Sequence, residues 1–395
     1  AVRLVPDLPG EYRVELRVHD GKLWGAPARV AVRVAPPGSK IAADRGPREE
    51  RFVDRRLEDR RLRRIRRLSF DLLWRGPSVE ELTRWYEASH EEVVDGLLAA
   101  EEAWSAWYES QLYYFLLLDQ FRPKEGPIPE LPARLLRGEA TPLRALEEIV
   151  RSQYFSARNP GNDTFVTVVL EQCLGMTVQE PRNKPLLEAG KKMYDGYAAK
   201  LFDEKGSSQA DFVRIVFRRK EFYEHLLRRS YRDLHGTEIE RKRLEGDRDR
   251  LAADPAAFRA LLREWLCAPE YLERAAAART KPEIPYVRAL FLDTLGRLPS
   301  YEELRNVRNA FLSMADPTPV RLVMGRVLMD TGAAALSGAA LDPPRFVREQ
   351  FVRLLARVPT PEEEAAFAGA LRDDPHVTPR IVVWTLLSSA EYQTY

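Results

Sequence analysis

Adjacent pairs of glutamates occur in similar local sequences at three places in this chain, Glu80-Glu81, Glu302-Glu303 and Glu362-Glu363. Two neighbouring carboxyl groups can share the roles of general acid and general base, which makes these pairs the first candidates for chemistry. Each pair, however, lies two and three residues after a Ser or Thr that itself follows a proline. A hydroxyl side chain followed three residues later by Glu is the capping box that starts an α-helix. The spacing therefore predicts that these acids are helix starts and not catalytic groups.

Residue types that bind metals or act as nucleophiles are sparse. The two cysteines, Cys173 and Cys267, are too few for a disulfide framework and stand in no CxxC spacing. The five histidines are scattered along the chain, and no phosphate-binding glycine loop, HExxH or GxSxG motif occurs. We therefore expect no catalytic residue, no metal centre and no cofactor.

Composition indicates a folded protein. The chain has 395 residues, of which 45% are hydrophobic and 31% charged, with 62 basic against 60 acidic residues and a formal net charge of +2. This balance is unlike that of disordered chains, and the length suffices for about two to four domains. No apolar run approaches the length of a membrane span, so we expect no transmembrane segment.

The acidic pairs belong to a repeated unit. Residues 71–82 align without gaps with residues 293–304, and the unit at Phe291 recurs 60 residues later at Phe351. A weaker copy starts at Tyr231. The copies close on similar segments, Ala268–Tyr271, Ser389–Tyr392 and the looser 103–108. Agreement of this kind indicates internal duplication.

Each copy has the pattern of a short helical bundle. An apolar helix ends, a proline prevents its continuation, and the capping box starts the next helix. Apolar residues at helical spacing predict an inner stripe for the last two copies. The predicted residues are Phe311, Val323, Val327 and Leu328, and Phe367, Val383, Leu386 and Leu387. The fold class predicted is mainly α, with repeated small helical bundles and a short N-terminal β segment.

That β segment lies in the first 36 residues. Tyr12, Val14 and Leu16 alternate with polar residues, Asp20-Gly21 is a hairpin turn signal, and residues 30–34 form a second strand pattern. The pattern resembles the closing strands of an Ig-like domain of the polycystic-kidney-disease or cadherin type. This resemblance implies that the earlier strands of the domain precede residue 1. The alternative is a hairpin docked on the helical body.

Nine arginines crowd residues 51–68, where apolar residues recur on one helical face. Such a helix could contact nucleic acid or an acidic surface. Acidic residues are interspersed among the arginines, however, which favours a solvated face with i,i+4 ion pairs. The arginine-rich helix remains a second-rank candidate for binding an anionic surface or nucleic acid.

The middle of the chain has a different character. Aromatic residues are dense over 104–115, most of them at core spacing, with Tyr113 and Tyr114 partly outside that stripe. A proline-rich loop follows, and residues 164–179 are ambiguous between strand and helix. We interpret residues 126–209 as an irregular region. An unrecognised enzymatic site could lie there, and its candidate residues are Arg158, Asp163, Glu171 and His225.

The segments RRLSFDLLWRGPSVEEL, LGRLPSYEEL and LARVPTPEEE, together with the closing VVWTLLSSAEYQTY, carry a family resemblance. They resemble the opening and closing domains of the planctomycete-type cytochrome-associated surface proteins, both of unknown function. The resemblance covers residues 51–395, weakly in the middle. It implies an extracytoplasmic location in the periplasm, outer envelope or cell surface, and Ig-like neighbours.

In that family the segment corresponding to residues 174–179 commonly continues into a CxxCH haem attachment site. Here it continues Glu180-Pro181-Arg182-Asn183-Lys184, and Cys173 comes too early. The two thiols and the histidine that would hold covalent haem are absent from this position. The comparison predicts a relative that keeps the scaffold without the redox centre.

From these observations we expect a non-catalytic structural or interaction subunit whose partners are other proteins of a larger assembly. The alternatives are a degenerate redox protein or enzyme with a site in the middle region, and an anionic-surface binder. The residues predicted to contact a partner are Arg60, Arg63, Arg67, Tyr113, Tyr114 and Arg122. The predicted segments are the Ig-like strands at 1–36, a linker at 37–50, and helical units at 51–125, 210–280, 281–340 and 341–395 around the middle region.

Overall fold

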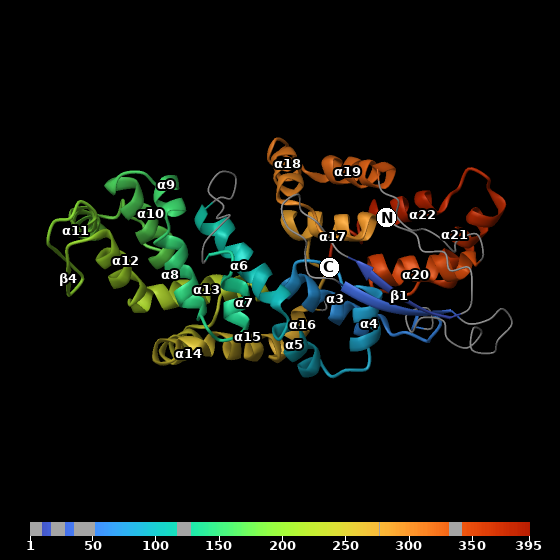
Figure 1. Ribbon diagram of the computed structural model, residues 1–395, viewed down its shortest axis with the longest axis horizontal. Coiled ribbons are helices and arrows are strands. Elements are labelled where there is room, and N and C mark those ends of the chain that lie inside the picture. Colours follow the sequence, from blue (N-terminus) through green and yellow to red (C-terminus); the bar gives the residue numbers. More distant parts are fainter. Residues whose placement is uncertain (1–9, 17–27, 35–51, 117–127, 276, 332–341) are drawn as a thin grey trace. The chain divides into compact units, whose positions relative to one another are not determined.

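The computed structural model describes residues 10–16, 28–34, 52–116, 128–275, 277–331 and 342–395. The chain divides into two units, Ala1–Arg56 and Leu57–Tyr395. The larger unit is built almost entirely of helices (Figure 1), so the prediction of a mainly α fold is confirmed. In its described residues the only strands form one short hairpin.

The smaller unit contains the predicted hairpin strands. Strands β1 (Gly10–Leu16) and β2 (Ala28–Val34) pair antiparallel, with Gly10 opposite Val34 and Leu16 opposite Ala28. The predicted Asp20-Gly21 turn lies outside the described residues. The Ig-like assignment of this segment stays a prediction.

Four repeated groups of helices form most of the larger unit, and we number them as copies 1 to 4. Copy 1 has α3 (Asp59–Leu73), α4 (Val79–Trp85) and α5 (His90–Leu98). Copy 2 has α13 (Lys220–His235), α14 (Arg241–Ala253), α15 (Phe258–Leu266) and the short α16 (Pro269–Ala275). Copy 3 has α17 (Glu283–Leu295), α18 (Tyr301–Leu312) and α19 (Thr318–Thr331). Copy 4 has α20 (Pro343–Leu355), α21 (Pro361–Asp373) and α22 (Pro379–Leu387).

The segment between copies 1 and 2 is largely helical, although residues 126–209 were predicted to be irregular. Its helices are α6 (Glu101–Leu116), α7 (Leu131–Leu136), α8 (Pro142–Val150), α9 (Gln153–Arg158), α10 (Asn162–Leu174), α11 (Lys184–Tyr194) and α12 (Gln209–Phe217). Strands β3 (Ala199–Leu201) and β4 (Glu204–Gly206) form the short hairpin, and single 3-10 turns lie at Pro181–Asn183 and Pro255–Ala257. The ambiguous residues became α10 because Phe165, Val166 and Val169 are fully buried on one side of a helix, and such packing overrides local β preference.

The first helices of the four copies end in the same backbone conformation. The first helix of every copy ends at a residue in the left-handed conformation: Trp74, Gly236, Gly296 and Ala356. Capping boxes then start α4, α18 and α21 at Ser78, Ser300 and Thr360. The predicted capping boxes are therefore confirmed.

Two hydrophobic cores lie in the larger unit. One contains copies 1 and 2 with the helices between them, and its largest fully buried side chains include Trp265 and Tyr271. The other contains copies 3 and 4 and includes Tyr286 and Tyr392. Each pair of copies thus has its own core.

One part of the predicted inner stripe is wrong. Val323 and Val327 on α19 are 63% and 51% exposed, because the packed face of that helix runs through Val320, Met324 and Leu328. The helical period was right but its phase was shifted by one position. In copy 4, Val383, Leu386 and Leu387 are buried as predicted.

Candidate functional site

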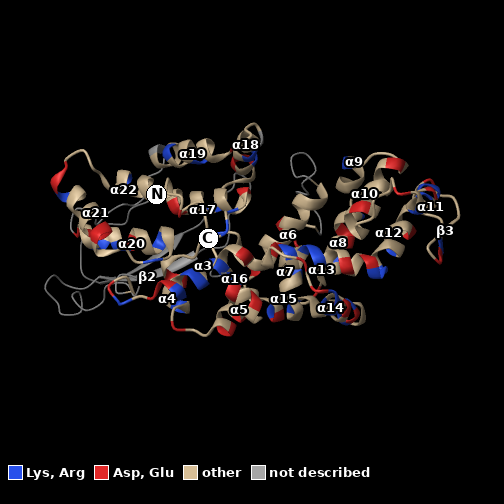
Figure 2. Cartoon of the chain, turned by 180° about the vertical axis from the view of Figure 1, so that it is seen from behind, with Lys and Arg blue, Asp and Glu red and all other residues tan. Residues whose placement is uncertain are grey.

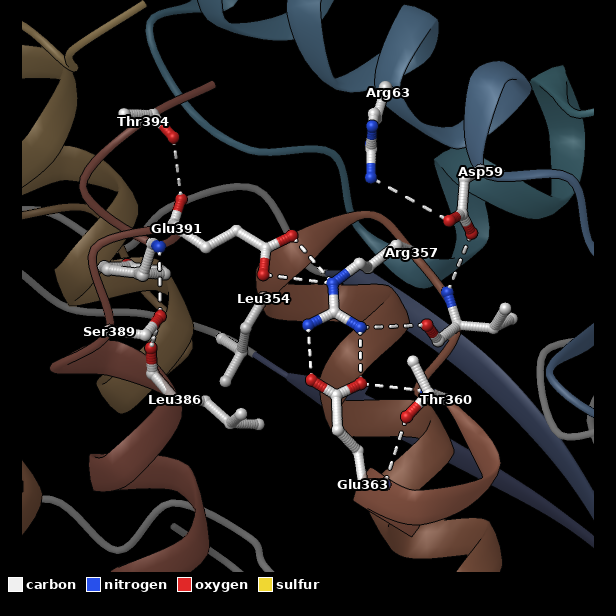
Figure 3. Close-up of polar contacts among 12 residues, drawn as sticks. Asp59, Arg63, Leu354, Arg357, Thr360, Glu363, Leu386, Ser389, Glu391 and Thr394 are labelled. Atoms are coloured by element: carbon white, nitrogen blue, oxygen red, sulfur yellow. Dashed lines mark hydrogen bonds and ion pairs between the residues drawn. The ribbon is translucent and has the colours of Figure 1, made fainter. Parts of the chain in front are cut away.

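In copies 1, 3 and 4 the arginine that directly follows the end of the first helix binds the glutamate of the capping box. In copy 4 the Arg357 guanidinium donates two hydrogen bonds to Glu363 at 2.7 and 2.8 Å. Its Nε donates to Glu391 at 2.8 Å (Figure 3). Glu363 also accepts the backbone N–H of Thr360 at 2.8 Å. We call this arrangement, an arginine shared by two glutamates, the arginine clasp.

Copy 1 contains the same clasp. Arg75 donates two bonds to Glu81 and two to Glu102, all at 2.7 Å. Although burial opposes it, hydrogen bonding to Arg75 lowers the pKa of Glu81, and hydrogen bonding to Arg357 lowers that of Glu363. Carboxylates held ionised in this way are poor proton donors at neutral pH. The geometry therefore supports a structural role for the acidic pairs.

The copies are joined in pairs by a repeated tyrosine–aspartate hydrogen bond. Tyr271 of copy 2 donates to Asp71 of copy 1 at 2.8 Å. Tyr392 of copy 4 donates to Asp293 of copy 3 at the same distance. The third helices of the paired copies also pack together, α5 against α15 and α19 against α22. Copies 1 and 2 are therefore related to each other as copies 3 and 4 are.

A cavity of about 600 Å³ lies beside Asp71, between residues of copy 1, copy 2 and α17. Its apolar wall is rich in aromatic rings. These belong to Phe70, Trp74, Trp104, Trp107 and Tyr395. The volume falls within the usual range of small-molecule sites.

The ionisable groups of the cavity differ in how they are bonded. Asp71 accepts hydrogen bonds from Arg67 Nε at 2.8 Å, from Tyr271 and from Tyr395 at 3.0 Å. Arg279 donates to the main-chain carbonyl of Asp233 at 2.7 Å, but no described residue donates to the Asp233 carboxylate. Partial desolvation raises the pKa of the Asp233 carboxyl, although Arg229, Arg279 and Arg232 oppose the rise and the residue is exposed to solvent. The Asp233 carboxylate therefore lines the cavity without a hydrogen-bond donor among the described residues.

Trp74 contributes to the cavity from a strained backbone position. Its φ is +58°, whereas the equivalent positions in copies 2 and 3 are glycines. A bulky residue in the left-handed region costs on the order of 1 to 3 kcal/mol and is retained only where its surroundings impose it. The strain places an indole on the cavity wall.

The arginines predicted to bind a partner divide into two groups. Arg60 and Arg63 are exposed on α3, and Arg63 lies 3.8 Å from Asp59. Arg67 is only 4% exposed and bonds to Asp71, so its prediction as a surface contact is wrong. It points inward because its Asp71 partner is itself buried. Arg66 is also buried and donates to the carbonyl of Leu354 in copy 4.

The aromatic candidates are largely used inside the protein. The hydroxyl of Tyr114 donates to the carbonyl of Gln172 at 3.1 Å, and the Arg229 guanidinium lies 3.8 Å from the centre of its ring. Tyr113 is partly buried against both cores. Arg122 lies outside the described residues.

The middle-region candidates have separate structural contacts. Arg158 donates to the carbonyl of Phe115, Asp163 pairs with Lys191, and the Glu171 carbonyl accepts from the N–H that closes α10. His225 lies 3.2 Å from the Tyr114 hydroxyl, and burial lowers its pKa to about 4. Among the described residues, no hydrogen bond or ion pair joins the four into one site.

Other chemistry-bearing residues are separate as well. Cys173 is buried, which raises the pKa of its thiol, and Cys267 is partly buried. Within the described ranges, no three His, Cys, Asp or Glu side chains are grouped as a metal site would require. None of the helices in those ranges combines the length and hydropathy needed to cross a bilayer.

Comparisons with protein-family models, with curated proteins and with solved structures find no match to this chain.

The sequence analysis missed Asp233 and Ala103 as cavity residues. The repeat could have indicated them, but the closing segment of copy 1 was aligned with those of the other copies at the wrong residue. Copy 1 was predicted to close over 103–108, yet Glu102 occupies the clasp position of Glu391. Each lies four residues after the end of the third helix of its copy. With that register Ala103 is the equivalent of Tyr392, one residue after the clasp glutamate.

Proposed function

We propose that this chain is a non-catalytic structural or interaction subunit of a larger extracytoplasmic or envelope-associated assembly. The observation that carries the proposal is the use of the repeated charged groups as joints between helices. Arg357 binds two glutamates of copy 4, and Arg75 binds Glu81 of copy 1 and Glu102 at the start of α6. Such groups stabilise a scaffold and leave no paired acids for catalysis. The extracytoplasmic location rests on the family resemblance of the motifs.

The two alternative functions have less support. Some arginines of α3 that would bind nucleic acid instead contact other parts of the protein. Arg61 pairs with Glu87, and Arg66 donates to the carbonyl of Leu354. Acidic and basic residues are also interspersed on helices such as α14 (Figure 2), where a phosphate-binding surface would be uniformly basic. An enzyme site in the middle region would need its four candidate residues to converge, and each has its own structural contact.

The exposed arginines of α3, Arg60 and Arg63, are the partner contacts that this proposal retains. The guanidinium group suits carboxylates of a neighbouring protein because it donates in a planar fork. A specific interface of the usual size buries about 1,200 to 2,000 Å² in total. We expect these two arginines to lie at the rim of such an interface.

Crosslinking with mass spectrometry on native envelope material tests the proposal. We expect reproducible crosslinks to one or a few proteins, and at least a threefold lower yield for the double variant Arg60→Glu, Arg63→Glu. Arg241→Glu, an exposed arginine on α14, is the matched control and should leave the yield unchanged. A chain that stays monomeric without crosslinked neighbours would contradict the proposal, as would turnover that disappears on mutation of His225 or Asp163.

A further inference from the structure

The copies differ in the tyrosine and aspartate residues that lie at the aromatic cavity. In each pair of copies the closing tyrosine of the second copy donates to the aspartate of the first, Tyr271 to Asp71 and Tyr392 to Asp293. A reciprocal contact between copies 1 and 2 would join position 103, on α6, to Asp233. The described residues of copies 3 and 4 show no such contact, because Arg353 stands at the aspartate position of copy 4. Position 103 is alanine where copies 2 and 4 have a tyrosine, and both Ala103 and Asp233 line the cavity. The short side chain at position 103 therefore leaves room on the cavity wall.

Asp233 has also lost the arginine that its equivalent uses. Arg67 lies four residues before Asp71 and donates to it at 2.8 Å. The corresponding Arg229 instead stacks on Tyr114 and donates to Gln111. The Arg67 and Tyr271 donors of Asp71 thus have no hydrogen-bonding counterpart at Asp233, although Arg229, Arg279 and Arg232 lie near enough to act on its charge. Asp233 is exposed to solvent and lines the cavity, so its carboxylate can accept a hydrogen bond from a ligand that enters there.

The remaining lining indicates the charge of such a ligand. Arg279 forms an ion pair with Asp71 at 4.0 Å and donates a hydrogen bond to the main-chain carbonyl of Asp233. Glu283 adds a third acidic side chain to the wall, beside Asp71 and Asp233. The indoles of Trp104 and Trp107 present ring faces and edges that attract both aromatic rings and cations. An ammonium group on an aromatic body matches all three features.

We propose that this cavity binds a small aromatic amine, with the ammonium group held by the Asp233 carboxylate and the ring packed among the indoles. The site is independent of the scaffold function proposed above, since it uses none of the exposed arginines of α3.

Phenethylamine is the probe that tests this assignment, and 2-phenylethanol is its neutral counterpart of similar shape. Calorimetry and tryptophan fluorescence should show saturable binding of phenethylamine to the full chain, at least tenfold tighter than binding of 2-phenylethanol. A charge-assisted hydrogen bond accounts for that difference. Asp233→Asn should remove the preference for the amine. Asp203→Asn, at an aspartate that is 94% exposed in the β3–β4 turn, should not change it.

Ala103→Tyr is the decisive second variant because it introduces the side chain that copies 2 and 4 have at this position. We expect it to keep the helical circular dichroism spectrum, to keep or raise the melting temperature, and to abolish phenethylamine binding. Equal affinity for the amine and the alcohol would overturn the proposal, as would binding that survives both Asp233→Asn and Ala103→Tyr. Absence of saturable phenethylamine binding to the unaltered chain would overturn it as well.

Discussion

Lys281 is the most unusual single residue of the described chain. Its side chain is fully buried, its Nζ lies 3.4 Å from the centre of the Tyr392 ring, and that Nζ makes no hydrogen bond. Burial and the neighbouring Arg66 hold the pKa of Lys281 well below its usual range. Nothing in the composition or spacing distinguishes this lysine from the exposed ones, because its burial depends on two helix groups meeting over it.

We predict that Lys281→Met raises the free energy of unfolding by about 1 to 3 kcal/mol at pH 7, since an apolar side chain replaces a buried amino group that makes no hydrogen bond. Between the lowered folded pKa and the unfolded value near 10.5, the unfolded chain binds more protons than the native chain. The stability of the unaltered protein should therefore rise with pH relative to the variant. Urea unfolding at pH 7, 8.5 and 10 measures this, and a difference independent of pH would contradict the assignment.

Acid should destabilise the protein through its buried histidines. Burial lowers the pKa of His235, which stacks on Tyr231 at 4.0 Å, to about 4. Between pH 6.5 and 4 the unfolded state takes up a proton that the native state refuses, so stability falls as the pH falls. The loss should be on the order of 2 kcal/mol for this histidine. Denaturant unfolding of the protein and of His235→Phe across that range should show a smaller loss for the variant; equal losses would contradict it.

At the scale of the helices, the sequence predicted correctly those features that depend on residues close together in the chain. A capping box needs only a hydroxyl and a glutamate three residues apart, so Ser78, Ser300 and Thr360 were found from spacing alone. The phase of α19 was not, because Val320 and Val323 both fit a helical apolar stripe. Only the positions of α17 and α22, against which α19 packs, select the buried face.

The clasp predicts a difference between copies. Arg357 is held by two glutamates and its side chain is 15% exposed, whereas Arg297 of copy 3 pairs with Glu303 alone among the described residues and is 51% exposed. We expect Arg357→Ala to lower the free energy of unfolding by about 1 to 3 kcal/mol and Arg297→Ala to have a smaller effect. Arg357→Lys should recover little, since lysine cannot donate in a fork. Thermal unfolding of the three variants measures the order, and an equal cost at both arginines would contradict the clasp as a joint.

At the scale of the whole described chain, the repeat was visible in the sequence but its pairing was not. The alignment of Asp71 with Asp293 says that the copies are similar. It does not say that Tyr271 reaches back 200 residues to Asp71. That contact, and the cavity left by its missing counterpart at Ala103, exist only once two copies face each other. The candidate cavity could therefore not be predicted from one copy's motif.

The paired architecture makes a matched prediction for two tyrosines. Tyr271→Phe removes the hydroxyl that joins copies 1 and 2, and Tyr392→Phe removes the one that joins copies 3 and 4. Each loss leaves a buried or half-buried aspartate short of one donor, which should cost about 1 to 3 kcal/mol. Because each pair has its own core, the loss of stability should be confined to the pair that carries the substitution.

Hydrogen exchange measured by mass spectrometry should show faster exchange in α3, α5 and α15 for Tyr271→Phe, with α20 and α22 unchanged. Tyr392→Phe should give the converse. Faster exchange spread evenly over both pairs in either variant would mean that the two cores open together, and the view of the larger unit as two similarly built pairs of copies would then fail.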